Sequence, residues 1–236
     1  DEINEMMPRI REETRANAKA YKKDATLLLR ATQGRVETNH RTPISETVST
    51  DAGDITFHFL AGDFFQNNPF ILPAFTGYVA DQASAGGAKY LVDAYCGSGL
   101  FSLCLAHKFK KVAGVEVSET AADWARRNAE LNKISNATFL ASSAEAIFAD
   151  IAFSADETAV VIDPPRKGCN EEFLNQLFTF GPSRVVYVSC NPATQMRDLQ
   201  AFLTAGYKIS AVQPFDLFPQ TRHLECVMVL QKIKPS

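Results

Sequence analysis

A cysteine at the end of an apolar run is the first residue whose type and position indicate chemistry. Residues 185–188 read Val-Val-Tyr-Val, and Ser189, Cys190, Asn191 and Pro192 follow. Such a run is typical of a buried parallel strand, and Pro192 cannot continue it, so the chain turns beside Cys190. Side chains at the carboxyl end of such a strand face the crevice where open α/β sheets bind ligands. A thiol there is either a small core residue or a nucleophile.

Two further segments place charged groups at the ends of apolar runs. Asp163 ends one run and is followed by Pro164, Pro165 and Arg166. The two prolines fix a stiff exit that would hold Asp163 at the crevice. Glu225 begins the last apolar run, where a partly buried carboxylate would have a raised pKa that suits a proton acceptor. The alternatives are a structural turn for the first segment and an ordinary edge-strand acid for the second.

Residues 91–102 predict a strand, a glycine turn and the start of a helix. Gly97 and Gly99 allow a tight turn and a close approach to a ligand, and the helix would present unpaired N–H groups. A nicotinamide-binding fingerprint would place glycine at position 102, which is Ser102 here. Glu116 ends the next apolar run, where an acid can accept both hydroxyls of a ribose. The pattern indicates either a dinucleotide or S-adenosylmethionine.

These residues need a sheet to position them, and strand and helix patterns alternate regularly from residue 89 onward. Strands are predicted at 90–94, 111–116, 137–140, 159–163, 184–189, 207–212 and 225–232, and helices at 99–108, 119–132, 144–151, 171–179 and 193–205. This rhythm predicts an α/β fold with a doubly wound, mostly parallel sheet and right-handed crossovers. The last two strands are joined without a good helix, which indicates an antiparallel strand at one edge.

The composition limits the class of protein. The chain has 236 residues, 46% of them apolar, enough for one α/β domain with an appendage. No apolar run is long enough to cross a bilayer, so we expect no membrane span. The five cysteines are scattered, which argues against a disulfide framework, a zinc site or an iron–sulfur cluster and favours an intracellular, reducing compartment. The chain begins with Asp1 and shows no signal peptide, so we expect a fragment; cytoplasm, nucleus and mitochondrion stay open.

The net charge of −3 is not that of a protein that coats nucleic acid, but the charge is uneven. Residues 8–41 hold nine Arg and Lys against four acidic residues. Such a segment can follow RNA phosphates, or it can be the solvated face of a helix.

In combination, the motifs resemble those of the S-adenosylmethionine-dependent RNA (uracil-5-)methyltransferases, and most of all the eukaryotic, fungal tRNA enzymes that make 5-methyluridine in the T-loop. The resemblance covers about residues 55–232. Its motifs are Phe64-Phe65-Gln66, residues 93–101, Glu116, residues 163–166, residues 189–192 and His223-Leu224-Glu225. It implies a Rossmann-like class I methyltransferase fold, S-adenosylmethionine as cofactor and tRNA as partner, and we expect a monomer.

The resemblance also assigns roles to single residues. Cys190 would be the nucleophile and Glu225 the base. The positions around the cofactor are Gln66, Tyr95, Gly97, Gly99, Glu116, Ser143 and Asp163, and those around the substrate are Phe64, Gln66, Asp163, Arg166 and His223. Phe64 would flank the target base, with Phe65 or Phe215 as alternatives. The implied domains are residues 1–62, an N-terminal helix with part of an RNA-contacting region, and residues 63–236, the catalytic domain.

The chemistry explains why this reaction needs a thiol and a carboxylate. C5 of uracil is a poor nucleophile until a thiolate adds to C6, and the C5 proton must later be removed before the thiol can leave. Four alternatives stay open: an rRNA uracil-5 methyltransferase, an amino-methyltransferase acting on an exocyclic nitrogen, a Rossmann dehydrogenase and a non-catalytic RNA-binding or RNA-folding module. The Asp-Pro-Pro tetrad of amino-methyltransferases typically ends in an aromatic residue, whereas this one ends in Arg166.

Overall fold

A computed structural model describes residues 8–10, 12–13, 16, 29–30, 36–37, 43–60, 63–66, 68–142, 148 and 151–233, with only the backbone described at 29–30 and 36–37. The chain divides into two compact units, residues 1–44 with 60–63, and residues 45–59 with 64–236. In the smaller unit, β1 (Leu29–Arg30) pairs antiparallel with β2 (Val36–Glu37). The described residues between 8 and 16 are helical, within the range where a helix was predicted.

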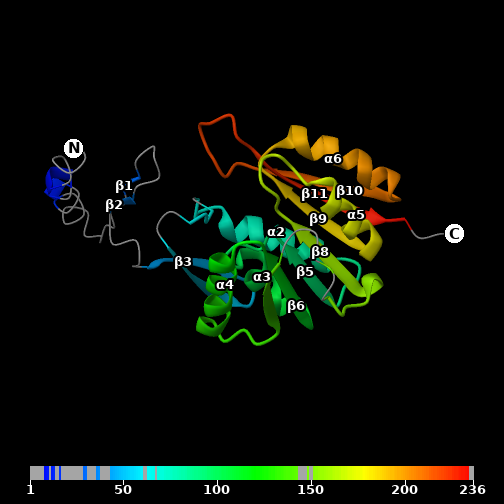
Figure 1. Ribbon diagram of the computed structural model, residues 1–236, viewed down its shortest axis with the longest axis horizontal. Helices are drawn as coiled ribbons and strands as arrows, with labels where there is room; N and C mark the ends of the chain where they lie inside the picture. The colour runs from blue at the N-terminus through cyan, green and yellow to red at the C-terminus, as the bar shows by residue number, and fades with distance from the viewer. Residues whose placement is uncertain are drawn as a thin grey trace. The chain divides into compact units, whose positions relative to one another are not determined.

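The larger unit is built on a seven-stranded sheet with the order β10-β11-β9-β8-β5-β6-β7 (Figure 1). The strands are β5 (Tyr90–Ala94), β6 (Lys111–Glu116), β7 (Ala137–Ala141), β8 (Thr158–Ile162), β9 (Arg184–Ser189), β10 (Tyr207–Phe215) and β11 (Glu225–Lys232). Strands β5 to β9 are parallel, whereas β11 is antiparallel to both β9 and β10. The predicted fold class is confirmed. The edge strand is β10, and the antiparallel strand β11 lies between it and β9.

Helices cover both faces of this sheet, as Figure 1 shows. One face carries α2 (Leu72–Ser84), α3 (Leu100–Leu105) with the short helix η1 (Ala106–Lys108), and α4 (Glu119–Leu131). The other face carries α5 (Glu171–Phe180) and α6 (Pro192–Thr204). The short helix η2 (Ala155–Glu157) directly precedes β8. Alternate residues of β8 show the two-sided burial, because Ala159 and Val161 join one core while Val160 and Ile162 join the other. The helix predicted at 144–151 lies almost entirely outside the described residues.

A β-hairpin packs on the α4 side of the larger unit. Strands β3 (Pro43–Thr50) and β4 (Gly53–Leu60) form a two-stranded sheet whose Val48 and Phe57 side chains are fully buried. The sequence indicates a strand at residues 55–59, whereas residues 32–54, rich in Gly, Pro, Ser, Thr and Asn, predict loops that can include one hairpin. The additional strand residues are stabilised by burial of alternate apolar side chains, a tertiary effect that overrides a polar, turn-rich sequence.

The described residues bear on three features considered in the sequence: a membrane span, a metal site and disulfide bonds. Within the described ranges, no helix has the length and apolar character needed to cross a membrane. The same residues contain no group of three or more His, Cys, Asp or Glu arranged to hold a metal ion. All five cysteines are free thiols; four of them are buried, and Cys190 is partly accessible.

Candidate active site

The sheet register brings Cys190 and Glu225 together. Strands β9 and β11 are antiparallel, and Cys226 pairs with Ser189. Continuing this register by one residue beyond the strand pair sets Glu225 opposite Cys190. Directly opposed residues in an antiparallel pair typically have Cα atoms about 4.5–5.5 Å apart and side chains on the same face. The proximity also shows in the charge interactions, because the Glu225 carboxylate raises the pKa of the Cys190 thiol. A thiol and a carboxyl group therefore lie side by side at the carboxyl edge of the sheet.

The turn around Cys190 is held by polar contacts at the start of α6. The hydroxyl of Ser189 accepts a hydrogen bond from the Asn191 N–H at 3.1 Å, and the Asn191 side chain caps the helix by accepting from the N–H of Ala193 at 3.2 Å. Cys190 directly precedes this cap, and a helix N-terminus favours negative charge close to it. The local structure therefore holds the thiol in a fixed place near a weakly positive helix end.

Arg166 is the positive group at the thiol. Its carbonyl accepts hydrogen bonds from Asn191 Nδ2 at 3.1 Å and from Thr194 Oγ1 at 3.2 Å, so the loop after β8 is bound to the start of α6. Burial raises the pKa of Cys190, and so does Glu225, whereas a hydrogen bond from the Arg166 side chain lowers it. In the free protein the thiol is protonated at neutral pH, and Arg166 is the residue that favours its thiolate.

A buried carboxyl group anchors the rest of the Arg166 loop. Asp198 on α6 is 3% exposed and accepts hydrogen bonds from the Cys169 N–H at 2.8 Å and from the Tyr187 hydroxyl at 2.7 Å. Arg197 binds the same carboxylate and also donates to the Lys167 carbonyl at 2.9 Å. These contacts fix residues 167–169 and so limit the positions that the preceding Arg166 can adopt.

Glu225 is the carboxyl group best suited to accept a proton. Its side chain is 1% exposed, and no hydrogen-bond partner for its Oε1 exists among the residues that the structure describes. Burial raises its pKa from 4.5 to about 7, an effect that the charge of Arg166 opposes. The pKa of Asp163 is also raised well above its ordinary value, first by burial and then by Glu225 and Asp93. The site thus contains two carboxyl groups, Glu225 and Asp163, whose pKa values burial raises.

The predicted glycine turn follows β5 and lies beside this cluster. Ala94 pairs with Ile162, so Tyr95 and Asp163 leave neighbouring parallel strands at the same edge. Gly97 and Gly99 have φ of +54° and +94°, and Tyr95 also adopts a positive φ of 66°. A methyl group added at Gly97 would meet no atom within 4 Å, so the backbone there borders open space. Such a bare turn is suited to a ligand that approaches the main chain closely.

Glu116 is bound to the turn in the structure. Its Oε2 accepts from the Gly97 N–H at 3.0 Å, and its Oε1 accepts from the Ser118 N–H at 2.9 Å. The carboxylate therefore lies where the sequence predicted it, at the end of β6 and in contact with the glycine turn. Ser143, the predicted adenine neighbour, lies outside the described residues.

Asp93 and Ser102 form a buried pair that sequence reasoning passed over. Both Ser102 N and Ser102 Oγ donate to Asp93 Oδ2, at 2.8 and 2.6 Å, and both side chains are fully buried. Burial raises the pKa of Asp93 to about 7 although the bonds from Ser102 oppose this, and its Oδ1 has no partner among the described residues. Ser102 stands where a nicotinamide-binding fingerprint would have glycine. The sequence did contain a signal of this pair, namely an acid at the end of a predicted strand and a serine nine residues later at the start of the next helix.

The aromatic segment before α2 divides into an exposed and a buried part. Phe64 is 73% exposed, whereas Phe65 is 7% exposed and stacks on Phe59 with 4.5 Å between ring centroids. Phe65 is therefore a core residue and not an alternative stacking platform, because the hairpin covers its ring. Gln66 is buried, and its Oε1 has no partner within the described part of the chain. Phe70, which the sequence analysis did not single out, is 95% exposed.

The same segment is joined to the connection between β10 and β11. Asn68 Nδ2 donates to the Leu217 carbonyl at 3.3 Å. The other alternative aromatic, Phe215, packs on Phe75 at 5.2 Å and belongs to the core rim. The His223 ring meets Phe218 edge-on with 6.3 Å between ring centroids.

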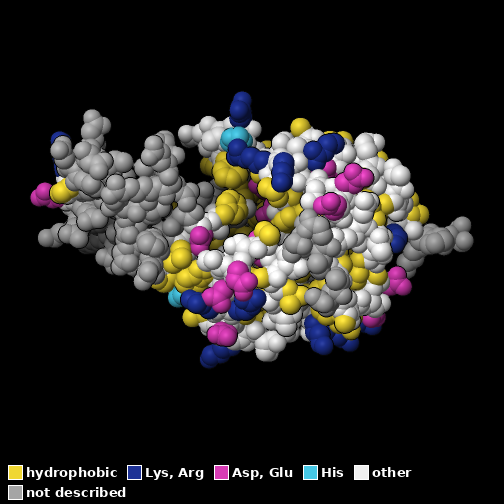
Figure 2. Space-filling model, in the orientation of Figure 1, with side chains coloured by type: hydrophobic (Ala, Val, Ile, Leu, Met, Phe, Trp, Pro, Cys, Tyr) yellow, Lys and Arg dark blue, Asp and Glu magenta, His cyan; other side chains and the backbone are white. Residues whose placement is uncertain are grey.

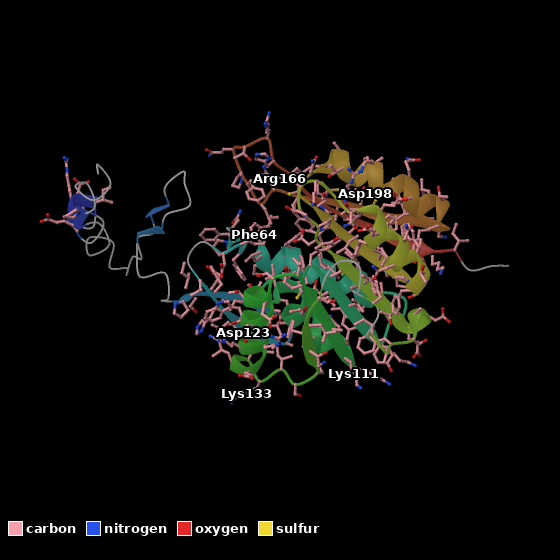
Figure 3. All side chains as sticks on the ribbon, viewed as in Figure 1. Phe64, Lys111, Asp123, Lys133, Arg166 and Asp198 are labelled. Carbon is pink, nitrogen blue, oxygen red and sulfur yellow. The ribbon has the colours of Figure 1, made fainter. Side chains whose placement is uncertain are left out.

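Surface views place the exposed groups at one end of the unit. Phe64 and Arg166 lie on the side away from Lys111, which starts β6 (Figure 3). Figure 2 shows hydrophobic side chains and Lys or Arg side chains next to one another at this end. The exposed Phe64 ring and the exposed Arg166 thus lie at the same end of the unit.

The strand order and the glycine turn define the class of protein. A parallel sheet with one antiparallel strand inserted beside its last strand, a glycine turn after β5 and an acid ending β6 form the Rossmann-like class I methyltransferase fold. A family model described as tRNA (Uracil-5-)-methyltransferase matches residues 2–233, and the chain belongs to this family. The family resemblance predicted from the motifs is confirmed.

Individual relatives agree with this assignment. The chain is 45% identical over 98% of its length to a tRNA (uracil(54)-C(5))-methyltransferase of Schizosaccharomyces pombe, and 44% identical over 83% to one of Saccharomyces cerevisiae. Among solved structures, Pyrococcus abyssi tRNA (uracil-54, C5)-methyltransferase in complex with S-adenosyl-L-homocysteine matches 83% of the chain with a TM-score of 0.67 and 31% identity. The chain spans 46%, 32% and 45% of the lengths of these three proteins.

Proposed function

We propose that this chain is the catalytic part of an S-adenosylmethionine-dependent methyltransferase that converts a T-loop uridine of tRNA to 5-methyluridine. The observation that carries the proposal is the register that sets Glu225 opposite Cys190, beside the Arg166 loop and the glycine turn. The names of the two fungal relatives support tRNA and C5 of uracil as the target, and the archaeal complex supports the cofactor.

The residues at the turn fit the cofactor. Gly97 borders open space, Glu116 lies in contact with the turn, and the buried Gln66 Oε1 and Asp93 Oδ1 have no partner among described residues. Bound S-adenosylmethionine would supply an electrophilic methyl group on a positively charged sulfur. Glu116 is placed to accept ribose hydroxyls, and a bound cation would favour the ionised forms of the buried Asp93 and Asp163, whose pKa values are raised in the free protein. Tyr95, at the same turn, packs on Phe173 with 5.1 Å between ring centroids.

Cys190 begins the reaction with its thiolate. The thiol first gives its proton to solvent water, and the hydrogen bond from Arg166 stabilises the anion that remains. A bond then forms between Sγ and C6 of the uracil, and the electrons of the C5–C6 double bond move onto the ring as an enolate. C5 thereby becomes nucleophilic, and bound S-adenosylmethionine would supply the methyl group and keep the electrons of the methyl–sulfur bond.

Glu225 completes the reaction. After methyl transfer C5 carries both a proton and a methyl group, and the Glu225 carboxylate removes the proton. The electrons of the C5–H bond restore the double bond, and the C6–Sγ bond breaks to release Cys190. A pKa of about 7 is matched to this task, because the carboxyl group accepts a proton and returns it at neutral pH.

The target uridine has to leave the RNA stack to reach the thiol. Phe64 lies at this end of the unit, and its exposed ring offers a face on which an unstacked base can pack. Arg166 and the exposed Arg222 provide positive charge for RNA phosphates. Gln66 has both an amide donor and an acceptor, as pairing with a uracil edge requires.

A methylation assay tests the proposal. The chain is incubated with a tRNA transcript and S-adenosylmethionine carrying a labelled methyl group, and the RNA is digested to nucleosides. The expected product is 5-methyluridine, absent from a transcript whose position 54 is cytidine. A label on an exocyclic nitrogen would replace the proposal with an amino-methyltransferase. RNA binding without transfer, under conditions where S-adenosylhomocysteine also binds, would leave a non-catalytic RNA-binding module.

A further inference from the structure

The edge of β4 is paired with the side chains of Asn128 in α4 and of Asn132, the residue that caps the C-terminal end of α4, instead of another strand. Asn128 Oδ1 accepts from the His58 N–H at 2.8 Å, and its Nδ2 donates to the His58 carbonyl at 3.0 Å. Asn132 repeats this pattern on Thr56, at 2.8 and 2.7 Å. Each amide supplies one donor and one acceptor and so imitates the backbone of a neighbouring strand.

The spacing of the two asparagines fits the strand for a geometric reason. Residues four apart on an α-helix are displaced by about 6 Å along its axis and lie on one face. Residues two apart on a strand are displaced by about 6.6 Å and present their N–H and C=O groups on the same edge. Asn128 and Asn132 therefore match His58 and Thr56 with the strand running opposite to the helix.

Asn128 makes one contact that Asn132 lacks. Its Nδ2 also donates to the Ser98 carbonyl at 3.1 Å, so both amide hydrogens are used. Ser98 lies between the two glycines of the turn after β5. The remaining donor of Asn132 instead binds the Asn128 carbonyl within the same helix, at 2.7 Å. Asn128 is fully buried, whereas Asn132 is partly accessible.

The contact to Ser98 fixes one peptide of the turn from both sides. The Ser98 carbonyl is held by Asn128, and the N–H of the same peptide, on Gly99, donates to the Cys96 carbonyl at 2.9 Å. Gly99 has a φ of +94°, a region in which glycine can adopt several conformations at little cost. Without the bond from Asn128, this peptide would be held only by its Gly99 N–H, and its buried carbonyl would lack its partner.

We propose that Asn128 is a positioning residue for the cofactor: it holds the Ser98–Gly99 peptide in the binding conformation and joins that turn to the β3–β4 hairpin. The inference rests on the proposed function in one respect, namely that the turn after β5 binds S-adenosylmethionine. Asn128 touches no reacting atom. It acts through the backbone of the turn, and its counterpart Asn132 binds Thr56 of the hairpin and the Asn128 carbonyl instead of the turn.

The test compares two matched variants, Asn128→Ala and Asn132→Ala. Each removes two hydrogen bonds to β4, but only Asn128→Ala releases Ser98. Binding of S-adenosylhomocysteine is measured by titration calorimetry, which needs no RNA and no turnover. Asn128→Ala is expected to raise Kd about tenfold, whereas Asn132→Ala leaves it within about twofold of the original chain. Equal changes in the two variants would overturn the proposal and reduce Asn128 to a hairpin contact.

If Asn128→Ala does not fold, hydrogen exchange tests the same role of Asn128 in the unaltered chain. Hydrogen exchange of the unaltered chain is followed with and without S-adenosylhomocysteine. The His58 amide, which donates to Asn128, is expected to gain more protection than the Thr56 amide, which donates to Asn132. Equal protection of both amides would contradict the coupling.

A third variant separates this proposal from the proposed function. Glu116→Ala removes the carboxylate bound to the turn and is expected to weaken binding of S-adenosylhomocysteine. If Glu116→Ala weakens binding and Asn128→Ala does not, only the positioning role fails. If Glu116→Ala has no effect, the cofactor does not lie at this turn, and the proposed site fails with it.

Discussion

Replacing Glu225 by glutamine should make the protein more stable at alkaline pH. Glu225 is 1% exposed, and burial raises its pKa from 4.5 to about 7. A difference of this size corresponds to about 3 kcal/mol of destabilisation when the carboxylate is ionised. Glutamine has the same shape and carries no charge, so Glu225→Gln removes that cost. It also relieves the neighbouring Asp163, whose pKa Glu225 raises, and this second effect has the same sign.

The pH dependence has a definite direction. Below pH 4.5 the folded and the unfolded chain both hold the proton, and the raised pKa costs nothing. Between pH 4.5 and 7 the unfolded chain releases its proton while the folded chain keeps it, so the stability of the original chain falls as the pH rises. Above pH 7 the loss is complete. The free energy of unfolding of Glu225→Gln relative to the original chain should therefore rise by about 2 to 3 kcal/mol between pH 5 and pH 8.

Urea unfolding at these two pH values measures this difference, because other titrating groups affect both proteins and largely cancel. At pH 8 the variant should also melt about 5 to 10 °C above the original chain. Glu172→Gln, a change on the exposed start of α5, is the control and should give the same difference at both pH values. A Glu225→Gln difference that is also equal at pH 5 and pH 8 would refute the raised pKa, and with it the reason for choosing Glu225 as proton acceptor.

Two further predictions concern the thiol and the glycine turn. Arg166→Ala removes the hydrogen bond that favours the Cys190 thiolate. The pH midpoint of thiol alkylation should therefore move to higher pH, and the alkylation rate at pH 7.5 should fall about tenfold. An unchanged midpoint would mean that Arg166 does not act on the thiol. Gly99→Ala sets a side chain at φ +94° and 3.3 Å from Ala125 Cβ, so urea unfolding should show a loss of about 1 to 3 kcal/mol, whereas no loss would contradict the tight packing of the turn.

The sequence predicted the strands of the main sheet well where they are buried on both faces. Strands β5, β6, β9 and β11 have the predicted bounds, because a continuous apolar run flanked by turn residues has few other ways to bury its side chains. The hairpin was harder to predict. Strand β3 is polar on one face and carries Thr and Ser throughout, and β4 is paired with side chains of α4, some 70 residues away. No local pattern encodes that pairing.

The candidate site was predicted as a set of residues but not as a geometry. Cys190, Asp163 and Glu225 each end or begin an apolar run, which indicates the edge of a sheet. Their mutual placement depends on the register between β9 and β11, which is set by packing across the whole pair. Phe65 was not separated from Phe64 because adjacent aromatics look alike until the hairpin covers one of them. Asn128 was missed because a single asparagine inside a helix carries no signal of its partners.

The most direct test of the central claim is to trap the bond between Cys190 and the target base. The chain is incubated with S-adenosylmethionine and a T-arm RNA that carries 5-fluorouridine at the target position, and the mixture is analysed by denaturing mass spectrometry. Fluorine cannot be removed as a proton, so Glu225 cannot complete the reaction and the methylated adduct should accumulate. We predict a mass equal to protein plus RNA plus one methyl group, and its loss in Cys190→Ala. An RNA that binds and is methylated without forming this adduct, or an adduct that persists in Cys190→Ala, would contradict the account.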